Sequence, residues 1–397
     1  MRSFGSIAIL GACIFLTGIA SAAVTPYRGI VAIDGLGMAN GTYALVLTLA
    51  SIGAAIGSVA LGFLSDKIAD RRRLVLFCAV LGALAYGLIW LVPTQFAYIV
   101  AVCAILPFGT ALFSQTFGYA RTYLDQNKDP RAEFKISVLR SLFTAAWVVT
   151  PPIAGWVASS HSVLDVFLVA TIAQIACIAM IGFLLFSPNA KVSRPAQGRD
   201  TSAEGAPFPL DRLIGTIGVA VLRIAIVVNL TVFPLVVTND IQAGLGELGL
   251  AARLAAALEV PFMLLWGLAA TRWPKEPIMI FNGLIFAVYL GGMSLARNFQ
   301  DVLLLQGLNA IATAALLSIT ISYVQEAIRG RVGLSTSLID VMGVTAGFAS
   351  AGLFAWLAKP DSYADVLLAS AVVSVVGAGL VALSWVLKRR REPTRTI

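Results

Sequence analysis

The sequence predicts an integral membrane protein built only of α-helices, with twelve membrane-spanning segments. Hydrophobic residues make up 59% of the 397 residues and charged residues only 12%, whereas a soluble domain carries about 25% charged residues. A soluble protein of this size could not cover so much apolar surface. Twelve spans of about 20 residues need about 240 residues, close to the hydrophobic content. The apolar runs are long and continuous, which favours helices over the alternating ten-residue segments typical of membrane β-barrels.

The order of the elements follows from the apolar runs and the charges between them. We place the spans at residues 6–32, 41–64, 74–92, 96–120, 136–158, 164–186, 212–237, 247–270, 277–295, 302–325, 334–357 and 364–387. Of the 28 Lys and Arg residues, 22 lie in the tails and in the connections after even-numbered spans, and three lie on the other side. Because basic residues collect in cytoplasmic loops, we expect both termini in the cytoplasm. The same rule explains the net charge of +8, so we expect no nucleic-acid partner.

The chain divides at its longest polar stretch, residues 188–210, which has six spans on each side. Its Pro, Gly, Ser and Ala content is typical of a flexible linker. We therefore expect an N-terminal half at 1–187 and a C-terminal half at 211–397 with a basic tail. The halves share weak similarity, since residues 111–119 match 315–323. Parallel repeats with a site between them are an architecture of transporters.

The chain offers little for catalysis or cofactor binding. Its one histidine, His161, lies in a short connection, and each of the four cysteines lies in an apolar run without a CxxC spacing. Nucleotide-binding and zinc-protease motifs are missing from the sequence. We therefore expect no enzyme, no metal and no cofactor, and an ion gradient rather than ATP as the energy source.

The connection after the second span carries a recognisable pattern, Gly62-Phe-Leu-Ser-Asp66-Lys67-Ile-Ala-Asp-Arg71-Arg72-Arg73. It resembles the loop motif of the major facilitator superfamily, although the usual second glycine is replaced around Ala69-Asp70. The resemblance implies a major facilitator fold of two six-helix halves. Gly62 would allow close helix contact. We assign charge pairing and gating to Asp66, Arg71, Arg121 and Arg223.

Further segments are similar to the bacterial sugar efflux transporter family, in the order of that family. They are Arg121-Thr-Tyr123-Leu-Asp125, Leu139-Arg140, Ala146-Trp147-Val148, Leu258-Glu259-Val260-Pro261, Leu305-Gln306-Gly-Leu-Asn309-Ala310 and Gly330-Arg331-Val-Gly333. This resemblance implies proton-coupled export of small sugars across the bacterial inner membrane. Arg223, Arg253 and Asp340 stand where that pattern has uncharged residues, so a charged ligand stays open.

Ionisable residues inside a span are costly and need a reason, at about 2.5–3.5 kcal/mol each on insertion scales. Glu259 lies about eleven residues into the eighth expected span, near the bilayer midplane at about 1.5 Å per residue. We assign proton coupling to Glu259 and Asp340. A fixed ion pair between Glu259 and Arg223 remains the competing interpretation.

The expected substrate site combines an arginine fork, amides and an aromatic ring. Arginine grips vicinal hydroxyls or carboxylates well, and tryptophan can stack on the apolar face of a sugar. Gln306 and Asn309 are one helical turn apart and share a face. We assign substrate binding to Arg140, Trp147, Asn229, Gln306, Asn309 and Gln115. Static ion pairs and interhelical hydrogen bonds explain such residues equally simply.

Together these features predict a secondary active transporter that exports small sugars or glycosides in exchange for protons, by alternating access. We expect it to work as a monomer in the lipid bilayer. Two alternatives remain: a proton-coupled exporter of drugs or charged metabolites, and a symporter for uptake.

Overall fold

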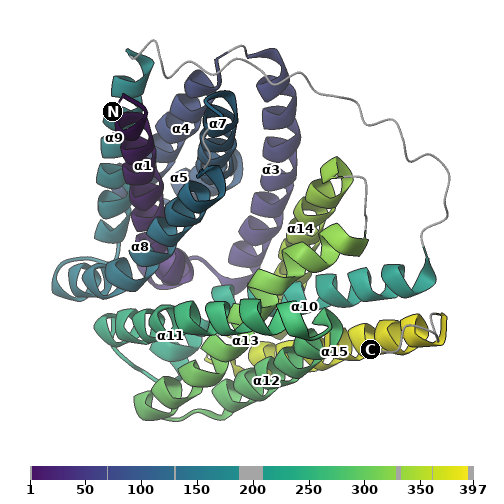
Figure 1. Cartoon of the computed structure of the whole chain (residues 1–397). Helices are drawn as coiled ribbons and strands as arrows, with labels where there is room; N and C mark the ends of the chain where they lie inside the picture. Colours follow the sequence, from purple (N-terminus) through teal and green to yellow (C-terminus); the bar gives the residue numbers. More distant parts are fainter. Residues whose placement is uncertain are drawn as a thin grey trace. The chain divides into compact units, whose positions relative to one another are not determined.

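The computed structural model confirms the all-helical class (Figure 1). It describes residues 2–68, 70–128, 131–186, 209–327, 332–359 and 361–391. Among these residues the one pairing of extended backbone is an isolated bridge between Lys359 and Ser362.

The chain forms two compact units. One comprises Met1–Gln197 and Gly244–Arg253, and the other comprises Gly198–Ala243 and Leu254–Ile397. The first turns of helix α11 (Leu245–Arg272) therefore group with the first unit. The expected linker at 188–210 lies almost wholly outside the described residues.

The first unit is built on α1, which packs against α8 and α9, while α4 packs against α9 and α6. A close approach of backbones joins α4 and α6, because a Cβ atom on Gly109 would lie 2.7 Å from the Cα of Gly82. Its elements are α1 (Arg2–Val24), η1 (Thr25–Tyr27), α2 (Arg28–Ile30), η2 (Val31–Gly35), α3 (Asn40–Lys67), α4 (Arg71–Leu91), α5 (Gln95–Val100), η3 (Ala101–Ile105), α6 (Leu106–Thr110), α7 (Leu112–Gln126), α8 (Ala132–Ser160) and α9 (Asp165–Leu185).

The second unit is built on α15, which packs against α10 and α12, while α14 packs against α10. Glycine again allows a close contact of backbones: a Cβ atom on Gly377 would lie 2.9 Å from the backbone nitrogen of Leu222. Besides α11, the elements are α10 (Leu210–Leu235), η5 (Val236–Asp240), α12 (Lys275–Leu295), α13 (Phe299–Ala327), α14 (Val332–Leu357) and α15 (Ala364–Arg391).

Eleven of the twelve expected spans correspond to helices of the described residues that are long and apolar enough to cross a membrane. The expected span at 334–357 corresponds to the apolar helix α14, and Val341–Leu357 is the apolar stretch of its described side chains. The fourth expected span is not one regular helix, because a π-helical turn and Pro107 separate α5 from α7. Proline lacks a backbone N–H and disturbs the helical ladder.

Two further π-helical turns occupy matching places in the sequence. Both η2 and η5 follow the first long helix of a unit, and both precede a helix of 28 residues, α3 or α11. Val236 follows Val31 by 205 positions, and Leu245 follows Asn40 by the same number. This constant spacing supports an internal repeat of six helices.

Candidate functional site

Glu259 lies half-way along α11, about 21 Å from either end at 1.5 Å per residue. Its side chain is half-buried, and it makes no hydrogen bond or ion pair with any described residue. The interpretation of a fixed ion pair with Arg223 is therefore wrong for this structure. Two turns further along α11, the indole N–H of Trp266 donates to the carbonyl of Ile311 on α13 at 3.0 Å. Positions 259 and 266 share a face, so Glu259 lies on the side of α11 that contacts α13.

Arg223 of α10 reaches α14 instead. A Cβ atom on Gly343 would lie 3.7 Å from Arg223 Nη2. Asp340 comes three residues earlier on α14, and its side chain lies outside the described part.

Two of the expected sugar ligands are bound into a packed network of the second unit. The hydroxyl of Tyr289 donates to Asn229 Oδ1 at 3.1 Å and also interacts with Gln306. Asn229, Tyr289 and Gln306 are all buried. Asn309 donates to Gln306 Oε1 at 2.8 Å, yet its own buried Oδ1 accepts no hydrogen bond from the described residues. Asn309 is half-buried, and its Oδ1 is the acceptor of this network that can bind a further donor.

The first unit presents Arg140 and Trp147 two turns apart on one face of α8. Arg140 is exposed, and its guanidinium makes no hydrogen bond or ion pair with the described residues. Sequence reasoning missed an aromatic group beside them. The ring of Phe113 lies 4.8 Å from that of Phe117 and 4.5 Å from that of Phe143, which is one turn from Trp147. These three phenylalanines are half-buried and join α7 to α8.

Gln115 is half-buried on α7 and makes no hydrogen bond through its side chain within the described residues. Sequence reasoning also missed a group around Arg28, which it only counted among the three basic residues of the outer side. The hydroxyls of Tyr43, Tyr86 and Tyr98 lie within electrostatic reach of Arg28, and that of Tyr98 donates to its carbonyl at 2.9 Å. Tyrosines scattered over three helices carry no sequence signal of such a grouping.

The expected gating residues of the first unit make modest contacts. Arg71 donates to the hydroxyl of Thr122 at 3.4 Å, and Arg121 pairs with Asp125 at 3.2 Å on an exposed face of α7. The side chain of Asp66 lies outside the described part.

The neighbouring pair, Asp70 and Arg72, is much better built. Asp70 caps α4 by accepting from the backbone N–H of Arg72 at 3.1 Å, and both of its oxygens bind the Arg72 guanidinium, at 2.7 and 2.9 Å. Arg72 is buried and also donates to the carbonyl of Leu184 at the end of α9, at 2.8 Å. Burial alone would raise the pKa of Asp70, but the hydrogen bonds and charge of Arg72 outweigh it and lower that pKa below its ordinary value.

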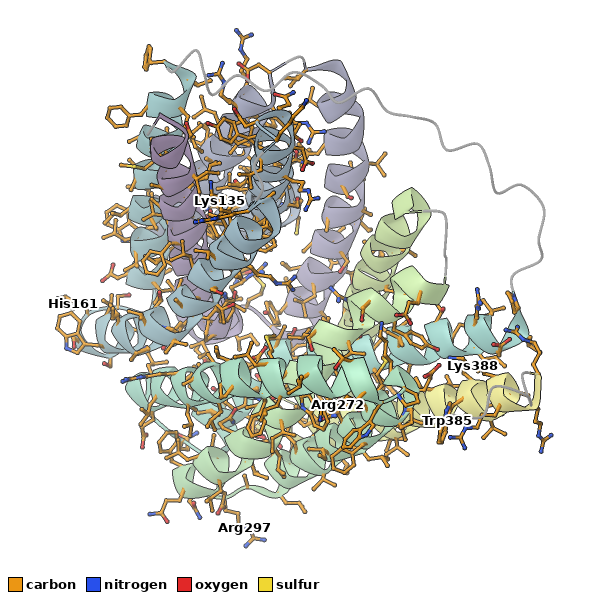
Figure 2. All side chains as sticks on the ribbon, viewed as in Figure 1. Lys135, His161, Arg272, Arg297, Trp385 and Lys388 are labelled. Carbon is orange, nitrogen blue, oxygen red and sulfur yellow. The ribbon has the colours of Figure 1, made fainter. Side chains whose placement is uncertain are left out.

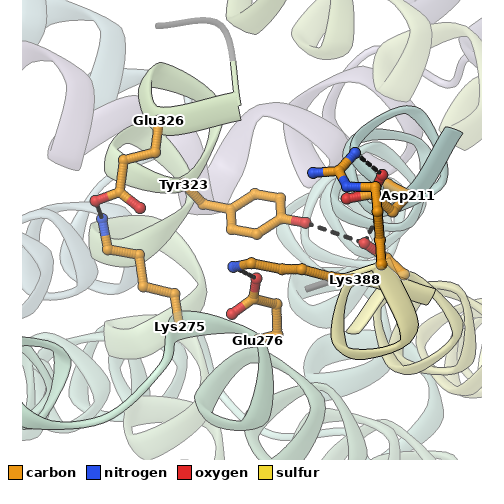
Figure 3. A network of polar contacts seen from close by, with 8 residues as sticks. Asp211, Lys275, Glu276, Tyr323, Glu326 and Lys388 are labelled. Carbon is orange, nitrogen blue, oxygen red and sulfur yellow. Dashed lines mark hydrogen bonds and ion pairs between the residues drawn. The ribbon is translucent and has the colours of Figure 1, made fainter. Parts of the chain in front are cut away.

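A second polar cluster closes the matching end of the second unit (Figure 3). There Lys388 pairs with buried Glu276 at 2.7 Å, and Arg391 pairs with buried Asp211 at 2.6 Å. The hydroxyl of Ser384 donates to the carbonyl of Asp211 at 2.6 Å. These contacts tie α15 to α10 and α12. Part of the basic tail therefore neutralises buried carboxylates, which the charge count did not predict.

These groups offer hydrogen-bond donors and acceptors to a polar solute. Within the described residues, no three or more His, Cys, Asp or Glu side chains gather where they could hold a metal.

Comparisons with known proteins agree with this architecture. The family model of the Major Facilitator Superfamily matches residues 10–219. Sugar efflux transporter B of Salmonella typhimurium is 32% identical over 82% of this chain and 81% of its own length. Sugar efflux transporter C of Escherichia coli is 28% identical over 82% of each chain.

Solved structures show the same fold at low sequence identity. The nucleoside transporter NupG superposes with a TM-score of 0.72 at 14% identity, over 96% of this chain and 99% of its own. The peptide transporter POT in complex with sulfate gives 0.76 at 12% identity, over 97% and 94%. Eleven of the described helices are long and apolar enough to cross a membrane, and the family model and the curated relatives match the chain. The chain therefore belongs to the major facilitator superfamily and, within it, to the sugar efflux transporter family.

Proposed function

We propose that this multi-pass membrane transporter exports small sugars or glycosides in exchange for protons, with both termini in the cytoplasm of a bacterial cell. The single observation that carries the coupling is Glu259, a carboxyl group at the middle of a membrane span without a fixed ionic partner among the described residues. A buried carboxylate without a counter-charge is costly. Glu259 is therefore suited to take up a proton. The free-energy cost of its charged form differs between two states of the transport cycle when its exposure to water differs.

The substrate class rests on the sugar efflux transporters that this chain resembles and on the side chains that remain available. Arg140 offers five N–H donors, and Trp147 lies on the same face of α8 as Arg140. Asn309 keeps an acceptor. Donors, acceptors and a ring are the groups that a sugar requires. We assign sugar binding to these three residues, and within the second unit Asn229, Tyr289 and Gln306 form the network that supports Asn309.

Charge coupling at Arg223 is the second part of the proposal. Arg223 reaches α14 within one turn of Asp340, so we propose that these two residues pair in one state of the transport cycle. Proton and sugar would each shift the binding free energy of the other by the same amount.

Transport in proteoliposomes tests this function. Vesicles that contain the wild type or Glu259→Gln are loaded with labelled sugars. The matched control is Glu247→Gln, on the first turn of the same helix. An imposed pH gradient should drive sugar flux in the wild type and the control. Glu259→Gln should lose gradient-driven flux but keep sugar exchange at equal pH.

Each other outcome has a defined meaning. Full coupling in Glu259→Gln would contradict its role and direct attention to Asp340. Failure of every sugar to move, while a charged metabolite or drug does, would replace the sugar by that class. Co-directional movement of proton and sugar would show a symporter.

A further inference from the structure

An apolar groove lies on the second unit, away from the polar groups assigned above. It has a volume of about 500 Å³ and is formed by the end of α11, the start of α12 and the end of α15. Trp266, Trp273 and Trp385 line it together with Phe281 and Arg389. The rings of Trp266 and Phe281 meet edge to face at 6.3 Å. Three of the seven tryptophans of the chain thus gather at one groove.

The groove opens on an exposed apolar surface of the second unit. Trp273 is 64% exposed and Phe281 is 55% exposed. Leu264, Leu265 and Leu268 of α11 are exposed as well. Such apolar exposure on a membrane span implies contact with acyl chains. The lining is mostly aromatic and apolar, with Arg389 as its one charged residue.

The groove lies at the level where the bilayer meets water. The cluster of Lys388 with Glu276 and Arg391 with Asp211 occupies the same end of α15 (Figures 2 and 3). Tryptophans beside basic residues mark the membrane interface. The distribution of basic residues assigns this end to the cytoplasmic leaflet.

The charges at this end are not equivalent. Lys388 and Arg391 are committed to carboxylates of their own unit. Arg389 makes no ion pair or hydrogen bond with the described residues, and its guanidinium lies 4.0 Å above the ring of Trp385, at the groove. A guanidinium stacked on an indole still presents its N–H edges, which match the geometry of a phosphate.

From these observations we propose that the groove binds an anionic phospholipid of the cytoplasmic leaflet. The phosphate would accept hydrogen bonds from Arg389, and the upper part of an acyl chain would pack on Trp273, Trp385 and Phe281. Basic pockets between helices at the cytoplasmic face bind acidic lipid head groups by the same chemistry.

Fluorescence quenching by brominated lipids tests the site on the full chain. The protein is reconstituted into phosphatidylcholine vesicles that contain a small, equal fraction of either brominated phosphatidylglycerol or brominated phosphatidylcholine. Tryptophan emission should fall further with brominated phosphatidylglycerol, because that lipid occupies the groove preferentially. Arg389→Gln should reduce this preference about fivefold, whereas Arg389→Lys, which keeps the charge, should retain most of it.

The adjacent Arg390→Gln is the matched control, since Arg390 is also exposed but does not line the groove. It should leave the preference unchanged. Equal quenching by both lipids in the wild type would overturn the proposal. Equal loss in Arg389→Gln and Arg390→Gln would also overturn it, because the preference would then come from the diffuse charge of the tail. Neither outcome depends on which solute the protein transports.

Discussion

Removal of the Asp70 carboxylate should destabilise the first unit far more than the loss of an ordinary surface charge. In Asp70→Ala, α4 loses its N-cap, which contributes about 1 kcal/mol. Arg72 loses its hydrogen bonds to both oxygens of Asp70, at about 1.5–3 kcal/mol for hydrogen bonds to a charged group, while its side chain is only 7% exposed. The carbonyl of Leu184 still accepts from Arg72. We therefore expect a loss of about 3 kcal/mol in the free energy of unfolding.

Two further variants separate the contributions. Asp70→Asn keeps an N-cap acceptor and removes the charge, so it should cost about half as much. Asp125→Asn breaks the pair with Arg121, whose side chains are 48% and 54% exposed, and should cost at most about 0.5 kcal/mol. Unfolding by sodium dodecyl sulfate in mixed micelles, followed by circular dichroism, measures all three.

The pH dependence has a definite sign. The pKa of Asp70 is lowered in the folded state, so its stabilisation is complete above its ordinary value of 3.8 and is lost as pH falls through the lowered pKa. The stability of the wild type should therefore fall toward that of Asp70→Asn in strong acid. Equal destabilisation by Asp70→Ala and Asp125→Asn at neutral pH would refute the reasoning, because burial of Arg72 would then carry no energetic weight.

Three further substitutions test the second unit. Gly377→Leu should prevent the close contact of α10 and α15 and abolish monodisperse protein on size-exclusion chromatography, whereas Gly379→Leu, which meets no atom within 4 Å, should behave as the wild type. Tyr289→Phe removes the hydroxyl that donates to Asn229. The free energy of unfolding should fall by about 1–3 kcal/mol, seen as a lower thermal midpoint. An unchanged midpoint would show that water satisfies the amide. Glu276→Gln should weaken the attachment of α15, seen as faster amide exchange in its last turns, and unchanged exchange would contradict that role.

Much of the fold followed from the sequence, because long apolar runs have few alternatives in a bilayer. The expected spans at 74–92 and 277–295 begin and end within three residues of the observed α4 and α12. The interruption inside the fourth span was not predicted, since its cause is a single Leu106-Pro107 step in an otherwise apolar run. The helix α15 extends to Arg391, and the pairing of Lys388 and Arg391 with buried carboxylates at this end is not revealed by hydropathy.

The site was less predictable, because the sequence shows which polar residues lie in spans but not which of them already have partners. Glu259 makes no ion pair with the described residues. Asn229 and Gln306 instead interact with Tyr289, a residue that gave no signal in the sequence. The competing interpretation, an ion pair between Glu259 and Arg223, fails for a geometric reason, since Arg223 extends toward α14. Partner choice depends on rotations of helices that periodicity in a membrane span defines poorly.

The anchoring of α15 sets a practical limit on shortened versions of this protein. Hydropathy would end the last helix at residue 387, and a chain cut there would lose both Lys388 and Arg391. Asp211 and Glu276, each only 5% exposed, would then remain as buried carboxylates without a counter-charge. A chain cut after Arg391 retains both pairs. Tags and fusion partners for purification therefore belong beyond residue 391, where they leave the helix that closes the second unit intact.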